Sequence, residues 1–266
     1  MGAELLIIDP QNDFCVDSAP LCVPGAMEDM ERLAKMIDRC GEKFDDIHVT
    51  LDTHHRLDIS HPQMWLDKNG NHPPLTPPFA VISSEAMENG DWRPRFRQWY
   101  DRILAYEKAL EVNGRYPHVV WPEHCLVTTP GHNVVECLRG PLYNWEGQPA
   151  QVDYVTKGSN MWTEHYSAVQ ADVPDPQDHT TQLNTRLITT LERADIVYLS
   201  GEALNFCLAN TGLDIANNFG ADHVKKLHLL EDATSPVPGF DQLTDAFMND
   251  MIGRGMQVTT TDKVFA

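Results

Sequence analysis

The chain has 266 residues, 42% of them hydrophobic, and carries a formal net charge of −19 at pH 7. This length suits either one α/β unit with an insertion or two small domains, and the apolar content suits an ordinary core. So strong an acidic excess argues against binding to nucleic-acid backbones or anionic lipid, since both require clustered Lys and Arg. No apolar run approaches the roughly 20 residues needed to cross a bilayer. We therefore expect partners that are neither nucleic acid nor membrane.

The cysteines and the first residues favour a cytoplasmic location. The six cysteines are irregularly spaced, so reduced thiols fit them better than a disulfide framework. The opening MGAELLIIDP has no basic segment, and its short apolar run ends at Asp9. A buried strand explains this run better than a signal peptide does.

Apolar runs and helical spacings alternate along most of the chain. Short apolar runs predict strands at 4–9, 47–51, 152–155, 196–199, 227–230 and 256–260. Apolar residues recur at helical spacing in 25–40, 182–193, 208–218 and 241–254. This order predicts an α/β fold, doubly wound, with a mainly parallel sheet of about six strands and helices on both faces.

Residues from about 62 to 130 interrupt this alternation. The proline-rich segment 69–79 cannot form regular structure, and the segment 93–114 predicts a helix that ends at Gly114. We interpret 62–130 as an insertion that partly covers the site, within a single domain spanning 1–266.

Reactive side chains follow the predicted strands. Asp9 ends the first strand, Asp52 and His54 follow the second, and Lys157 follows the third. Cys207 stands just beyond the fourth strand, before a helix. Because ligands bind beyond the carboxyl ends of parallel strands, these groups are expected at one edge of the sheet.

Cys207 is the candidate nucleophile at this edge. A thiolate is the attacking form of cysteine, and a helix N-terminus stabilises it. Asp9 could accept the thiol proton and return it to a leaving amine, and Lys157 could hold the charged pair. Taken singly, the three residues also fit a buried cysteine, a capping carboxylate and a surface lysine.

Asp52 and His54 are candidate metal ligands. They point to the same face if the strand continues, because side chains alternate along a strand. Carboxylate and imidazole ligands favour a divalent ion, with zinc first and iron or manganese as alternatives. His61 and His124 are candidate further ligands, whereas His55 should face away. A D-x-H pattern alone is a weak signal, since most such pairs bind nothing.

Several segments, in order, resemble one known family. The sequence DPQNDF at 9–14 resembles the D-x-Q-N-D-F opening of nicotinamidases and the wider isochorismatase-like cysteine hydrolases, and DTH at 52–54 is similar to their metal-binding D-x-H. WPEHC at 121–125 resembles the nicotinamidase W-P-x-H-C, whose histidine binds metal. Lys157-Gly158 matches the catalytic-lysine segment, and 201–207 matches the nucleophile loop.

This resemblance implies a metal-assisted cysteine hydrolase that cleaves a small carboxamide, first of all nicotinamide, through a thioester. The implied catalytic residues are Asp9, Lys157 and Cys207. The implied oxyanion hole comprises the amides of Ala203 and Cys207, next to a cis peptide bond between Glu202 and Ala203. The implied metal ligands are Asp52, His54 and His124, and the implied aromatic slot is lined by Phe14, Trp121 and Tyr166. Relatives often form oligomers, so a homo-oligomer is expected from the resemblance alone.

The chain also departs from the family pattern. His61 follows D-x-H at a shifted spacing, Glu202 replaces an apolar residue, and Asn205 stands where many relatives are acidic. These changes affect the pocket, so they bear on the substrate more than on the reaction. Two other functions stay open: hydrolysis of another small amide, carbamoyl compound or vinyl ether, and a catalytically silent binding protein.

Overall fold

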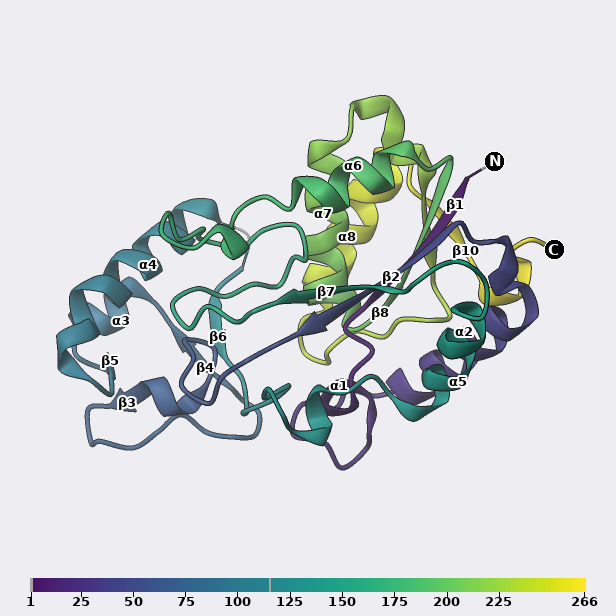
Figure 1. The fold of residues 1–266 in the computed structure, drawn as a ribbon. Coiled ribbons are helices and arrows are strands. Elements are labelled where there is room, and N and C mark those ends of the chain that lie inside the picture. The colour runs from purple at the N-terminus through teal and green to yellow at the C-terminus, as the bar shows by residue number, and fades with distance from the viewer. Residues whose placement is uncertain (1, 115) are drawn as a thin grey trace.

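The computed structural model describes residues 2–114 and 116–266. Six strands form its central sheet in the order β10-β9-β8-β1-β2-β7, and every neighbouring pair is parallel (Figure 1). The strands are β1 (Ala3–Ile8), β2 (Asp46–Asp52), β7 (Asp153–Lys157), β8 (Ile196–Gly201), β9 (Leu227–Leu230) and β10 (Gln257–Thr259). The prediction of a mainly parallel sheet of about six strands is confirmed, and this sheet is wholly parallel.

Helices cover both faces of the sheet (Figure 1). The helices on one face are α2 (Ala26–Cys40) and α5 (Glu136–Trp145). The helices on the other face are α6 (Thr185–Arg193), α7 (Ala209–Asn218) and α8 (Asp241–Gly253). Strand β1 supplies apolar side chains to both cores, Leu5 and Ile7 to the first and Leu6 and Ile8 to the second. This two-sided burial explains the continuous apolar run at the start of the chain.

Between β2 and β7 the chain forms a lobe of small elements, on the left in Figure 1. The lobe contains β3 (Trp65–Asp67), β4 (Ala80–Ile82), α3 (Ser84–Glu88), β5 (Trp92–Pro94), α4 (Tyr100–Asn113) and β6 (His118–Val120). Strands β3 and β5 pair antiparallel, as do β4 and β6. Lobe side chains such as Trp65 and Ile103 share one buried cluster with Leu6 and Ile8 of the sheet. The lobe therefore packs on the same face as α6, α7 and α8.

Some predicted helix boundaries are wrong. The helix predicted over 93–114 begins only at Tyr100, because 92–94 pairs with β3, although it does end before Gly114 at φ +64°. Helix α6 begins after Asn184, whose side chain accepts a hydrogen bond from the backbone N–H of Leu187 (3.1 Å). Leu183 therefore lies outside the helix and is exposed.

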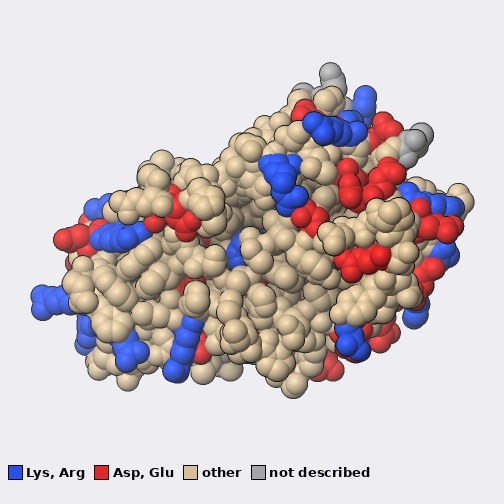
Figure 2. Space-filling view, in the orientation of Figure 1, with Lys and Arg blue, Asp and Glu red and all other residues tan. Residues whose placement is uncertain are grey.

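Helix α5 was not predicted, since Pro141 inside it obscures the helical pattern. A short helix, α1 (Asn12–Cys15), follows β1. In the described ranges no helix has the length and apolar character to span a bilayer. On the face shown in Figure 2, acidic and basic side chains are interspersed, without a continuous basic area.

A buried ion pair joins α4 to β6 inside the lobe. His118 Nδ1 lies 2.6 Å from Glu107 Oε1, and both side chains are 1% exposed. Burial lowers the pKa of His118, but attraction to Glu107 outweighs it and raises the pKa above the ordinary 6.5. The stabilisation is therefore full below the ordinary histidine pKa and lost as the pH rises through the higher pKa of the folded state.

Removing one member of this pair should strongly destabilise the protein. Glu107→Ala leaves His118 buried without its partner, so the free energy of unfolding at pH 6 should fall by about 3–5 kcal/mol, measured by urea denaturation. Lys108→Ala is the matched control, because Lys108 is the next residue of α4 and pairs with Glu88 in solvent. Equal midpoints and slopes for the two variants would contradict a stabilising role for the buried pair.

Candidate active site

The sheet register brings the predicted residues to one edge. Asp52 and Lys157 are directly paired at the ends of β2 and β7. Asp9 follows β1, which lies between β2 and β8. Gly201 ends β8 at φ +100°, and a Cβ there would collide with the backbone of Ile8. Only glycine therefore lets β8 approach β1 so closely and turn into the loop that carries Cys207.

Lys157 lies at the centre of a buried charged cluster. Its Nζ is 2.9 Å from Asp9 Oδ2, 3.1 Å from Asp52 Oδ1 and 3.6 Å from Cys207 Sγ. Oxygen atoms of Asp9 and Asp52 and the sulfur of Cys207 all lie within 4.8 Å of one another. Thr50 Oγ1 donates a hydrogen bond to Asp9 Oδ1 (2.5 Å), which fixes that carboxylate. The residues proposed from the sequence as nucleophile, base and lysine are thus in mutual contact range.

Burial controls the charge states in this cluster. Burial raises the pKa of the Cys207 thiol well above its usual range, although Lys157 opposes this. Burial also raises the pKa of Asp9 against the attraction of Lys157. Burial disfavours the Lys157 ammonium, but Asp52 and Asp9 outweigh this effect and hold its pKa well above the usual range. Burial therefore favours the neutral thiol of Cys207 and makes the carboxylate of Asp9 more basic, whereas the two carboxylates favour the ammonium form of Lys157.

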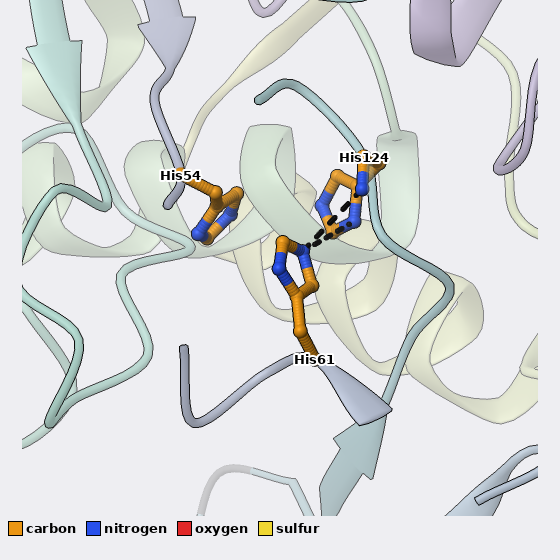
Figure 3. A group of neighbouring side chains, drawn as sticks. All are labelled: His54, His61 and His124. Carbon is orange, nitrogen blue, oxygen red and sulfur yellow. Dashed lines mark hydrogen bonds between the residues drawn. The ribbon is translucent and has the colours of Figure 1, made fainter. Parts of the chain in front are cut away.

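Three buried histidines, His54, His61 and His124, lie close together (Figure 3). Ring nitrogens of His54, His61 and His124 lie within 4.8 Å of one another, and all three side chains are buried. Asp52 Oδ2 is 3.0 Å from His54 Nε2 and 3.5 Å from His124 Nε2. His55 is exposed, as its position in the D-x-H segment predicts. This set of imidazoles and one carboxylate fits a divalent ion such as zinc.

Sequence analysis missed the residue that orients His54. Asp58 Oδ2 lies 3.1 Å from His54 Nδ1, while its Oδ1 accepts hydrogen bonds from the backbone N–H (3.0 Å) and the hydroxyl (2.8 Å) of Ser60. A carboxylate on the far nitrogen is the usual partner of a metal-binding histidine, because it fixes the ring and its tautomer. The signal in the sequence is an acidic residue four positions after the histidine.

A small aromatic pocket opens onto Cys207. Its walls include the predicted Phe14, Trp121 and Tyr166, together with Phe206 and Val237. Trp121 Nε1 donates to Tyr166 Oη (2.6 Å), which ties two of these rings together. The cavity measures only about 30 Å³, which is space for about one water molecule. The walls of the pocket therefore lie close together in this structure.

Two further features surround Cys207. The peptide bond between Glu202 and Ala203 is cis, and residues Leu204–Leu208 form a single π-helical turn before α7. Sequence analysis missed Glu164, a buried carboxyl that also lines the pocket. Burial raises the pKa of Glu164 to about 7. The feature of the sequence that could have pointed to Glu164 is that it is the one acidic residue in the segment 159–167.

The six-stranded parallel sheet flanked by helices has the isochorismatase-like α/β fold, which solved structures of amidases share. The chain matches the Acinetobacter baumanii nicotinamidase pyrazinamidase over 99% of its length and 98% of that chain, with 22% identity and a TM-score of 0.66. It matches the pyrazinamidase of Pyrococcus horikoshii in complex with zinc over 98% of its length and 99% of that chain, with 19% identity and a TM-score of 0.58. It also matches N-carbamoylsarcosine amidase from Thermoplasma acidophilum over 99% of its length and 98% of that chain, with 16% identity and a TM-score of 0.52.

Comparisons at the sequence level give no match. No family model and no curated protein matches the chain. At these identities the structural likeness establishes the fold. The resemblance inferred from the short sequence segments is confirmed at that level.

Proposed function

We propose that the chain is a metal-assisted cysteine amidohydrolase that cleaves a small carboxamide, with nicotinamide as the leading substrate. The observation that carries this proposal is Lys157 Nζ within 3.6 Å of both Asp9 Oδ2 and Cys207 Sγ, where Cys207 also lines an aromatic pocket. A nucleophile, a base and an ammonium in such contact are the groups that acyl transfer to sulfur requires. Among the solved structures of similar fold, one is named a nicotinamidase and another an N-carbamoylsarcosine amidase.

In this mechanism Asp9 takes the proton of the Cys207 thiol as the sulfur attacks the amide carbonyl carbon. The backbone N–H groups of Ala203 and Cys207 bind the oxyanion. Asp9 returns the proton to the departing ammonia, and a thioester remains on the sulfur. Water, deprotonated by Asp9, then releases the acid and restores the thiol. Lys157 keeps its positive charge throughout and stabilises the thiolate and the carboxylate in turn.

Asp52, His54, His61 and His124 would hold the divalent ion. When bound, such an ion would orient a ring nitrogen of the substrate or supply a polarised water. Burial, followed by repulsion from His54 and His124, lowers the pKa of His61 well below its usual range. His61 is therefore a neutral imidazole, the form that binds a metal.

An ammonia-release screen combined with metal analysis tests the proposal. Purified protein should contain about one zinc, iron or manganese ion per chain, and should release ammonia and nicotinate from nicotinamide. Chelation should remove the ion and lower the rate at least about tenfold, and the same metal should restore it. Protein that releases ammonia from no planar carboxamide, or that works fully after metal removal, would refute the corresponding part of the proposal.

The same screen separates the alternatives. A preference for N-carbamoyl compounds over ring carboxamides would move the substrate toward that of the carbamoylsarcosine enzyme. Binding of a carboxamide without ammonia release would favour a catalytically silent protein. The single-domain organisation, a homo-oligomeric state and a cytoplasmic location stay predictions.

A further inference from the structure

The segment 233–237 runs alongside the nucleophile loop 201–205 and forms part of the pocket wall. Backbone and side-chain groups of the two segments are joined by four hydrogen bonds of 2.9–3.0 Å: Gly201 N to Ala233 O, Leu204 N to Ser235 O, Asn205 Nδ2 to Val237 O, and Val237 N to Asn205 Oδ1. The side chain of Val237 then lines the pocket with Cys207. The position of this segment therefore fixes one part of the pocket wall, the side chain of Val237.

Behind the pocket wall, Ser235 joins two buried carboxyl groups. Its backbone N–H donates to Glu202 Oε2 (3.1 Å), and its hydroxyl donates to Asp29 Oδ2 (2.5 Å) of helix α2. Glu202 is wholly buried and Asp29 is 2% exposed. The other oxygen of Asp29 accepts a hydrogen bond from Arg32 (2.5 Å). We call Glu202, Ser235 and Asp29 the Ser235 network.

The Ser235 network contains two carboxyl groups but, among the described residues, only one nearby cation, Arg32. One of the two carboxyl groups can therefore be ionised at low cost, whereas ionisation of both is disfavoured. Arg32 pairs with Asp29. Burial first, and then nearby carboxylates that include Glu202, raise the pKa of the Cys15 thiol of α1 and of the Cys22 thiol in the following loop. Burial, with the negative charge of Asp29 added, raises the pKa of Glu202 well above its usual range. Burial and Asp29 therefore favour the neutral carboxyl of Glu202, and its ionisation would place two negative charges together in the core.

We propose that Glu202 is a positioning residue that acts through the Ser235 network to hold segment 233–237 against the nucleophile loop. Glu202 directly precedes Ala203, so one residue connects the pocket wall to the proposed oxyanion amide. With the network intact, Val237 stays close to Cys207 and keeps the cavity near 30 Å³. Without it, the wall moves outward, the thiol is more accessible, and the amide of Ala203 is less well placed.

The effect on catalysis rests on the proposed function, whereas access to the thiol does not. Alkylation of Cys207 by iodoacetamide, followed by peptide mass spectrometry, therefore measures the pocket wall whatever the substrate is. Glu202→Ala should raise the alkylation rate at pH 7 roughly tenfold, since a buried hydrogen bond is lost. Glu202→Gln keeps an acceptor for Ser235 N–H and cannot ionise, so its rate at pH 7 should stay within about twofold of the native rate.

The pH dependence separates positioning from a merely structural role. Raising the pH should increase alkylation of the native protein more steeply than of Glu202→Gln, because only the native side chain ionises beside Asp29. Glu231→Gln is the matched control, because Glu231 is an exposed carboxylate two residues before the segment 233–237, and its profile should equal the native one. With an active amide substrate, Glu202→Ala should also raise KM and lower kcat.

Ser235→Ala provides a second test of the network if circular dichroism shows that Glu202→Ala does not fold. This change removes only the hydroxyl bond to Asp29, so it should raise alkylation about threefold. The proposal is overturned if Ser235→Ala and every folded Glu202 variant react at the native rate from neutral to alkaline pH. The two proposals can fail separately. If the native protein releases no ammonia from any amide but Glu202→Ala is still alkylated faster, the proposed function is overturned and the positioning role is supported.

Discussion

Cys207→Ala should abolish ammonia release from nicotinamide, with kcat at least about a thousandfold below the native value. Without the sulfur no thioester can form, and the remaining groups of the cluster only orient the amide and a water. Sγ lies 3.6 Å from Lys157 Nζ, so its removal also takes away the atom on which the ammonium acts. Initial rates of ammonia formation, measured with up to micromolar enzyme, would cover this range.

Cys40→Ala provides the matched control for this change. Cys40 is also a buried free cysteine, but it lies in α2, where Sγ donates to Met36 O (3.2 Å). This variant should keep native kcat/KM, and both variants should retain the native circular dichroism spectrum. Ammonia release by folded Cys207→Ala at more than a tenth of the native rate would rule out sulfur as the nucleophile.

The main sheet was predictable because its signals are local. Each short apolar run ends in a polar residue, and alternation of strands with helices leaves few topologies. These two facts predict from the sequence that Asp9, Asp52 and Lys157 lie at one edge of the sheet. The strands of the lobe were not predicted, since each spans only three residues, too few to show a period.

Contacts between distant segments could not be predicted in the same way. Asp29 and Ser235 are separated by 206 residues, and nothing in either local sequence marks the other as its partner. Likewise, the place of His61 in the histidine cluster depends on the turn at 58–61, where the N–H of His61 donates to Asp58 O (3.0 Å). Spacing from the D-x-H segment alone left its role open, because a turn changes the direction in which a side chain points.

Asp9→Asn should lower kcat about 10²–10⁴-fold, because the isosteric amide cannot accept the thiol proton. The acidic limb of the native pH–kcat profile should also disappear, since this limb reports protonation of Asp9. Asp17→Asn, a change to an exposed carboxylate, should leave both the rate and the profile native. Retention of the native acidic limb by Asp9→Asn would show that another group is the base.

Asp52 is the other carboxylate close enough to serve as that base, and its electrostatics argue against it. Burial raises the pKa of Asp52, but His54 and Lys157 outweigh this effect and hold it well below the usual range, which makes a poor proton acceptor. The pKa of Asp9 moves in the opposite direction.

Metal content distinguishes the two carboxylates directly. Asp9→Asn should lose activity and keep its metal ion, whereas Asp52→Asn should lose both. Loss of the ion from Asp9→Asn would mean that the two carboxylates act as one site, and proton transfer could not be assigned to Asp9 from these rates.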